Sequence, residues 1–160
     1  MKTLVKSAQV EVVVDADPAA VWALAGDPTR VGEWSGECHT VTWLDAGRTQ
    51  PEVGARFVGR NRLGRIRWKR VSEVVGLEPG RRIAWANLRS PLHPDTTRWE
   101  LTVSPTGTGT LITSRYSVSI GPLGDRMAAR FAPSHVDRRA EIAGDLRRLG
   151  DVAGRSCVVG

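Results

Sequence analysis

The sequence is poor in the residues that build metal and disulfide sites. Its two cysteines, Cys38 and Cys157, are too far apart for a C-x-x-C zinc or redox motif. Its three histidines, His39, His93 and His135, show no metal-ligand spacing. A glycine-rich phosphate loop is missing as well. We therefore expect no metal, no cofactor and no disulfide framework.

Long apolar runs are also missing. No segment approaches the roughly 18 consecutive apolar residues of a transmembrane helix, and the segment Met1–Lys6 lacks the apolar stretch of a signal peptide. These absences predict a cytoplasmic protein without membrane insertion. With 41% hydrophobic and 25% charged residues, the chain is too apolar to be disordered, and 160 residues suit one domain with one core.

Lysine is scarce beside arginine, a ratio typical of a GC-rich genome, and the formal net charge is +6. Most basic residues in the middle of the chain occupy positions opposite the aromatic ones and are interleaved with Glu73 and Glu100. This predicts a solvated outer sheet face with cross-strand ion pairs rather than a nucleic-acid site. The basic residues concerned are Arg56, Arg60, Arg62, Arg67, Lys69, Arg98 and Arg115.

Alternation of apolar and polar residues predicts a mostly β chain. Asp17-Pro18 is typical of a helix start and Gly26-Asp27-Pro28 of its end, so two short helices should follow the first strand, the second ending near Trp34. The expected strands are Ala8–Val14, Cys38–Leu44, Ala55–Arg62, Ile66–Val75, Arg82–Leu88, Thr97–Val103 and Thr110–Ile120.

The pattern of apolar residues in the C-terminal part of the sequence predicts one long helix over about residues 124–150, kinked at Pro133. Its apolar face recurs at steps of three and four residues. The residues on this face are Met127, Phe131, His135, Arg138, Ile142, Leu146 and Leu149.

These elements predict an α+β fold: a curved seven-stranded antiparallel sheet wrapped around a long C-terminal helix, with two short helices after the first strand. One helix cannot cover seven strands, so a concave, mostly apolar space should remain between the helix and the sheet. Such a space is the usual place for a ligand. We expect an apolar pocket there that touches Phe57, Trp85, Trp99 and Phe131.

An ordered series of short motifs resembles the SRPBCC superfamily, the START-related and Bet v 1-like proteins. Within it, the chain looks most similar to actinobacterial polyketide cyclase/dehydrase-like proteins. The resemblance implies a helix-grip fold, a single ligand-binding domain over residues 1–160 with its core at about 7–150, and binding or transport of a hydrophobic molecule. The motifs are Val12–Pro18 with Val21-Trp22, Gly26-Asp27-Pro28, Glu33-Trp34-Ser35, Val53–Phe57, Arg67-Trp68, Pro79-Gly80 with Trp85, Trp99–Pro105 and Gly109-Thr110.

His135 is the candidate catalytic residue, because it shares the apolar helix face and could exchange a proton with a bound carbonyl or phenol. It could equally hydrogen-bond a strand hydroxyl or a backbone carbonyl freed by Pro133. Aromatic side chains could form a rigid wall for a flat ligand or simply pack the core. The candidate ligand-binding residues are Trp34, Phe57, Asn61, Trp68, Trp85, Asn87, Trp99, Tyr116, Phe131, His135 and Arg138.

Three functions are compatible with these features. The first is binding of a small hydrophobic molecule, lipid-like or polyketide-like. The second is a cyclase or dehydratase that uses His135 as acid or base, and the third is a protein-interaction module that acts through the outer sheet face. The chain should be a monomer or homodimer. We expect His39 to be structural and His93 to be a solvated loop residue, while Glu37 should pair with an arginine.

Overall fold

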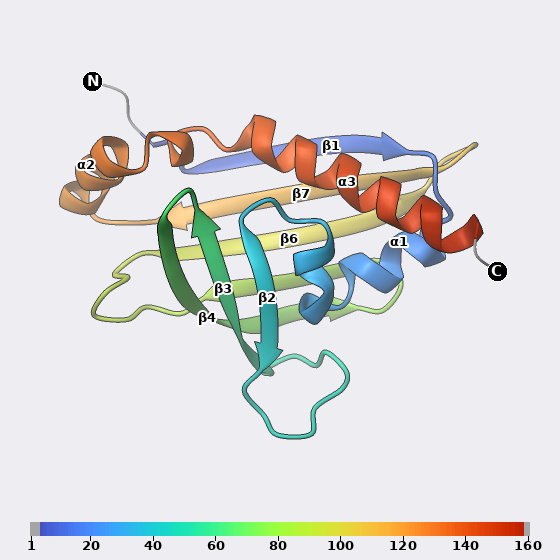
Figure 1. The fold of residues 1–160 in the computed structure, drawn as a ribbon, viewed down its shortest axis with the longest axis horizontal. Coiled ribbons are helices and arrows are strands. Elements are labelled where there is room, and N and C mark those ends of the chain that lie inside the picture. Colours follow the sequence, from blue (N-terminus) through green and yellow to red (C-terminus); the bar gives the residue numbers. More distant parts are fainter. Residues whose placement is uncertain (1–3, 159–160) are drawn as a thin grey trace.

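Seven antiparallel strands form one sheet in the order β1-β7-β6-β5-β4-β3-β2 (Figure 1). The computed structural model describes residues 4–158 of the chain. The sheet confirms the expected fold class, and each strand lies within a few residues of its predicted range. The strands are β1 (Ser7–Val14), β2 (Cys38–Trp43), β3 (Arg56–Leu63), β4 (Ile66–Glu78), β5 (Arg82–Asn87), β6 (Thr96–Pro105) and β7 (Thr110–Ser119).

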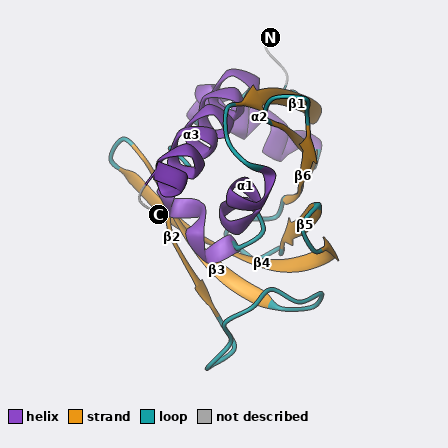
Figure 2. Cartoon of the chain, turned by 90° about the vertical axis from the view of Figure 1, so that its right-hand side faces the viewer, coloured by secondary structure: helices purple, strands orange, loops and turns teal. Residues whose placement is uncertain are grey.

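Two short helices follow β1, as predicted: α1 (Pro18–Ala25) and the 3-10 helix η1 (Pro28–Glu33). Asp17 occupies the N-cap position of α1, but its side chain makes no capping hydrogen bond. Asp27 does cap η1, because its carboxylate accepts a hydrogen bond from the Thr29 amide at 3.0 Å. Figure 2 shows α1 and α3 (Arg139–Val158) on the same side of the sheet, which curves around them.

The predicted long C-terminal helix is interrupted, which corrects the expectation of one kinked helix over 124–150. It consists of α2 (Pro122–Phe131), the 3-10 turn η2 (Pro133–His135) and α3. Pro133 lacks an amide hydrogen and its ring clashes with a preceding helical turn, so α2 ends before it. Asp137 then accepts a hydrogen bond from the Arg139 amide at 3.1 Å and starts α3 in a new direction.

The antiparallel order gives the sheet two distinct ends. The α2 end holds the β3–β4 hairpin tip, the β5–β6 loop (88–95) and the connection from β7 to α2. The opposite α1 end holds the β2–β3 loop and the β4–β5 and β6–β7 turns. The start of β2 lies at the α2 end, because Cys38 pairs with Asn61 of β3.

The apolar core lies mainly toward the α1 end. There α3 packs against β1 and α1, and Gly150 permits the close approach: a Cβ at this position would lie 2.4 Å from Cγ1 of Val14. The core side chains are almost fully buried, so this half of the concave space is filled. They include Val21, Leu24, Ile83, Val103, Ile112, Leu146, Leu149 and Ala153.

The outer face of the sheet carries the predicted cross-strand ion pairs. Arg56 Nε lies 2.8 Å from Glu73 Oε2, and Glu100 pairs with Arg82 and Arg115 on the two neighbouring strands. None of the described helices is long and apolar enough to cross a membrane.

Candidate functional site

Aromatic side chains form a continuous row across the concave face of the sheet. The strand register pairs Trp85 with Trp99 and Trp99 with Tyr116. The Phe57 ring lies edge-on to Trp85 at 6.4 Å between centroids, and the Trp99 and Tyr116 rings are 5.4 Å apart. Trp85 and Trp99 are half-buried, whereas Phe57 and Tyr116 are buried. This aromatic row lies on the face where the sequence placed it.

At the α2 end, Glu37 joins the sheet to the C-terminal region. Its Oε1 lies 2.6 Å from His135 Nε2, and its Oε2 accepts a hydrogen bond from the Arg138 guanidinium at 2.6 Å. We call these three residues the Glu37 cluster. All three side chains are largely shielded from solvent, with exposed fractions of 17–24%.

The segment before β2 holds Glu37 in position. Ser35 Oγ accepts hydrogen bonds from the backbone amides of Glu37 and Cys38. The Gly36 amide donates to Asp145 of α3 at 2.9 Å, and Arg148 of α3 donates to the Trp34 carbonyl at 2.8 Å. These contacts fix the segment against α3.

Aromatic rings surround the Glu37 cluster. The Arg138 guanidinium carbon lies 5.2 Å from the centre of the Trp99 ring, and the His135 ring is 6.0 Å from Trp68 in an edge-on contact. Arg138 Nε is buried without a hydrogen-bond acceptor, although it lies 3.6 Å from a carboxylate oxygen of Glu141. The cluster is therefore an ionic group at the end of an aromatic wall, with one donor left over.

Electrostatics keep the Glu37 carboxylate charged. Burial raises its pKa, but the hydrogen bond with His135 and the positive charge of Arg138 outweigh burial, and the pKa lies below the ordinary 4.5. Burial raises the pKa of the Tyr116 hydroxyl. Burial also raises the pKa of the Cys38 thiol to about 11, which argues against Cys38 as a nucleophile. The side chain of Cys157 lies outside the described residues.

The two remaining predicted residues on strands, Asn61 and Asn87, lie on the concave face. Asn61 is half-buried and lies opposite Trp68 in the β3–β4 register. Asn87 Oδ1 accepts a hydrogen bond from Ser72 Oγ at 2.7 Å, so it already has a protein partner. Trp34 is buried beside α3, and its indole nitrogen has no hydrogen-bond partner.

Phe131 does not lie where the sequence placed it. It was expected to face the sheet together with Met127, but both side chains are exposed on α2, Phe131 by 66%. The break at Pro133 rotates α2 away from the line of α3, so the predicted helix face is not continuous. Only its C-terminal part, Ile142, Leu146 and Leu149, is buried.

The other two histidines lie outside the cluster. His39 is exposed at an irregularity in β2 and contacts the Thr40 hydroxyl at 3.0 Å. His93 is half-buried in the β5–β6 loop, where burial and then the charge of Arg70 lower its pKa.

Sequence reasoning missed a second, largely buried ion pair. Arg70 of β4 donates two hydrogen bonds to the Asp95 carboxylate, at 3.0 and 3.2 Å, and a third to its carbonyl. Arg70 has the same strand parity as Trp68 and Ser72, a signal that could have identified it as a residue of the concave face. The pair anchors the β5–β6 loop at the α2 end.

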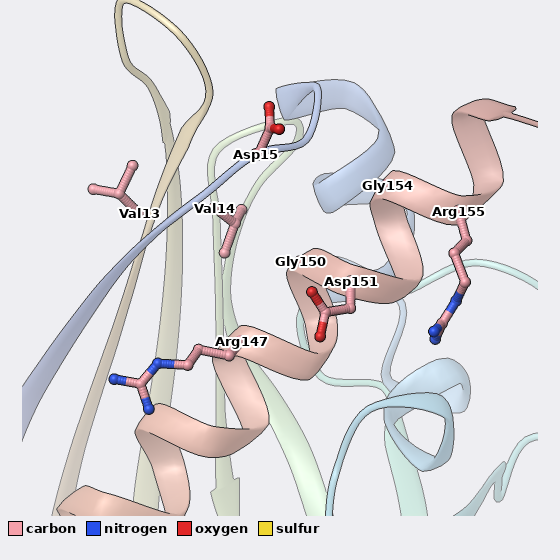
Figure 3. Close-up of a pocket in the computed structure, with 8 residues that line it drawn as sticks. All are labelled: Val13, Val14, Asp15, Arg147, Gly150, Asp151, Gly154 and Arg155. Atoms are coloured by element: carbon pink, nitrogen blue, oxygen red, sulfur yellow. The ribbon is translucent and has the colours of Figure 1, made fainter.

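Two surface depressions lie at the α1 end, away from the Glu37 cluster. The first, of about 840 Å³, lies between the end of β1 and the last turns of α3 and is open to solvent (Figure 3). Its rim carries Asp15, Arg147 and Arg155. The second lies beside the β6–β7 turn and the start of α1. Neither includes a residue of the aromatic row.

The chemistry available at the Glu37 cluster is therefore that of binding and proton exchange. The described residues include no group of three His, Cys, Asp or Glu side chains that could hold a metal. Arg138 can neutralise or hydrogen-bond an anionic or carbonyl oxygen. His135, oriented by a carboxylate, can donate or accept a proton.

Comparisons with known proteins agree with this fold. The model of the family described as "Polyketide cyclase / dehydrase and lipid transport" matches residues 6–154. A polyketide cyclase-like protein of Corynebacterium glutamicum, Cgl2372, is 27% identical; the match covers 99% of this chain and 93% of that chain, with a TM-score of 0.55.

Two more distant structures share the fold. The ginseng major latex-like protein 151 of Panax ginseng is 9% identical, with 98% of each chain covered and a TM-score of 0.67. The di-domain ARO/CYC protein StfQ of the steffimycin biosynthetic pathway is 16% identical, with 98% of this chain and 53% of that chain covered and a TM-score of 0.70. A comparison with curated proteins gave no match. Because the family model spans nearly all of the sequence, this chain belongs to the polyketide cyclase / dehydrase and lipid transport family.

Proposed function

We propose that this protein binds a small hydrophobic molecule, lipid-like or aromatic, on the concave face of the sheet at the α2 end. The single observation that carries the proposal is the Glu37 cluster, a largely buried ionic group set against an aromatic wall. Buried charges are costly, and a protein that needed only a stable core at this place could fill it with apolar side chains.

The cluster suits the polar end of such a ligand. Glu37 contacts His135 through Oε1 and accepts a hydrogen bond from Arg138 through Oε2. Arg138 keeps a further donor, Nε, without an acceptor. A carboxylate, sulfonate or carbonyl oxygen could take that donor or replace Glu37 as the acceptor.

The aromatic row suits the apolar body of the ligand. Trp68, Trp85 and Trp99 are only half-buried, in contrast to the filled core at the α1 end. Rigid aromatic faces bind flat or branched apolar groups at low entropic cost. Asn61 is a second polar contact. Asn87 becomes one after release of Ser72, and Tyr116 after its hydroxyl releases the Val5 carbonyl, to which it donates at 3.4 Å. Phe131 is exposed on α2 and could reach a ligand only if α2 moved.

A fluorescent amphipathic anion, 1-anilinonaphthalene-8-sulfonate, tests the proposal by titration. Arg138→Gln should weaken its binding by about 1–3 kcal/mol, the cost of losing a charge-assisted hydrogen bond. His135→Ala should weaken it within the same range. Glu37→Gln removes the competing carboxylate and should strengthen binding. Arg139→Gln is the matched control, because Arg139 lies one residue away and pairs with Asp137 at the surface.

The outcome separates two explanations. If Arg138→Gln and Arg139→Gln bind the probe equally well, the Glu37 cluster is a structural ion pair and the proposed site is wrong. If Arg138→Gln weakens and Glu37→Gln strengthens binding, the cluster holds the polar end of the ligand.

A second candidate, a cyclase or dehydratase, is favoured by the 2.6 Å contact between His135 and Glu37. A base oriented by a carboxylate is the arrangement that general acid–base catalysis uses. If a substrate is found, His135→Ala should reduce turnover by roughly a hundredfold with little change in binding. Equal turnover in this variant and the wild type would exclude an acid–base role.

A further inference from the structure

Helix α2 presents its apolar side to solvent. Leu123, Met127 and Phe131 are spaced four residues apart, so they form one stripe along the helix, and all three are exposed. None of the residues of α2 is fully buried. A surface helix of a folded protein ordinarily turns such a stripe toward the core.

The polar side of α2 is the side that attaches to the protein. Asp125 lies on the opposite side of the helix from the stripe, and its side chain is only 16% exposed. It accepts a hydrogen bond from the Leu4 amide at 3.3 Å and lies 3.3 Å from the Lys6 ammonium. The attachment to the N-terminal segment therefore holds the apolar stripe outward.

Other exposed apolar side chains gather at the same end. Ile66 lies at the tip of the β3–β4 hairpin and Leu92 in the β5–β6 loop, and both are exposed. The hairpin reaches η2 through the contact between Trp68 and His135. The loop is tied to the end of β7 by Arg89, whose guanidinium donates to Ser119 at 3.5 Å. Figure 1 shows α2 and the β5–β6 loop together at one end of the molecule.

Exposed arginines without acidic partners surround these apolar residues. In the part of the chain that the structure describes, none of them forms an ion pair with a carboxylate, whereas Arg56 and Arg82 elsewhere on the sheet both do. Arg130 instead lies 5.9 Å from the Phe131 ring. The arginines concerned are Arg65, Arg67, Arg89, Arg126 and Arg130.

We propose that the α2 end adsorbs to a membrane surface that contains anionic lipids. An apolar stripe flanked by arginines fits the boundary between headgroups and acyl chains, where the stripe leaves water and the arginines meet lipid phosphates. A nucleic acid would neutralise the arginines but leave Leu123 and Met127 in water. A second copy of the chain would bring like charges together. Adsorption at headgroup level requires no membrane-spanning helix.

The surface adjoins the proposed ligand site. His135 follows α2 directly, so adsorption would bring the Glu37 cluster and the aromatic row near the lipid. The inference nevertheless stands without a bound ligand, since it rests on the exposed residues of the α2 end. The two proposals can therefore fail separately: the probe titration needs no membrane, and the vesicle assay needs no ligand.

Flotation with two kinds of vesicle tests the proposal. We expect the protein to float with vesicles of equimolar phosphatidylcholine and phosphatidylglycerol, to remain unbound with phosphatidylcholine alone, and to bind less in high salt. Arg126→Gln/Arg130→Gln should weaken binding at least about tenfold. Its matched control is Arg147→Gln/Arg155→Gln, which removes the same charge from the exposed surface of α3.

A second pair of variants tests the apolar stripe. Leu123→Ser/Met127→Ser/Phe131→Ser should abolish flotation. The control Val13→Ser/Leu44→Ser/Val53→Ser removes exposed apolar side chains at the α1 end and should float like the wild type. Circular dichroism verifies that each variant is folded. Absence of flotation by the wild type, flotation independent of anionic lipid, or equal losses in variant and control would each overturn the proposal. Duplex DNA binding or dimer formation through α2, without flotation, would overturn it in favour of that partner.

Discussion

The Glu37 carboxylate and the His135 imidazole, 98 residues apart in the sequence, lie 2.6 Å from each other. This contact ties the start of β2 to the turn between α2 and α3. With Arg138, it places an ionic group beside the aromatic rings of Trp68 and Trp99 at the α2 end of the concave face.

Removal of the Glu37 charge should destabilise the fold near neutral pH. We expect Glu37→Gln to lower the free energy of unfolding by about 1–3 kcal/mol, since Arg138 and His135 lose their carboxylate acceptor. Because the pKa of Glu37 in the folded protein lies below 4.5, its contribution is present above about pH 4.5 and is lost as the pH falls through the lowered value.

Urea unfolding of the wild type and Glu37→Gln between about pH 7 and about pH 3 measures this contribution. The difference between the two proteins should stay constant near neutral pH and shrink in acid. A difference that grows in acid would contradict the assigned pKa direction.

Removal of the Asp95 carboxylate should lower the free energy of unfolding more than removal of a solvent-exposed carboxylate. Arg70 and Asp95 have side chains exposed by only 11% and 20%, so Asp95→Ala leaves a largely buried guanidinium without a counter-charge. We expect a loss of about 3–5 kcal/mol in unfolding free energy. Glu33→Ala is the control, because its pair with Arg30 is solvent-exposed and such a surface pair contributes about 1 kcal/mol or less. Equal effects of the two substitutions would show that the buried pair is not structurally important.

Alanine substitutions at two glycines of α3 should change the stability of the fold in opposite directions. Gly150→Ala places a methyl group within 2.4 Å of Val14 Cγ1, so the helix must move away from β1. We expect a loss of about 1–3 kcal/mol from this overpacking. Gly144→Ala meets no atom within 4 Å and should stabilise the helix, by up to about 1 kcal/mol on helix propensity. Thermal unfolding of both variants checks the sign of each effect, and a stabilised Gly150→Ala would refute the packing of α3 on β1.

Most of the fold follows from short-range patterns. Alternation and turn residues place all seven strands, because a strand that buries one face must alternate along the chain. The parity of Phe57, Trp85 and Trp99 likewise puts them on the concave face. Pro133 marks the place where the C-terminal helix breaks, since the loss of an amide donor is a local effect.

Only the tertiary structure decided which side chains pair with Glu37 and which way the apolar stripe of α2 faces. The sequence suggests that Glu37 pairs with an arginine, but the choice of Arg138, 101 residues away, depends on how β2 and α3 meet. The apolar stripe of α2 predicts a buried face, yet the attachment of Asp125 to Lys6 turns that face outward. Periodicity reveals which residues share a side of a helix; only the contacts of the folded chain determine what that side faces.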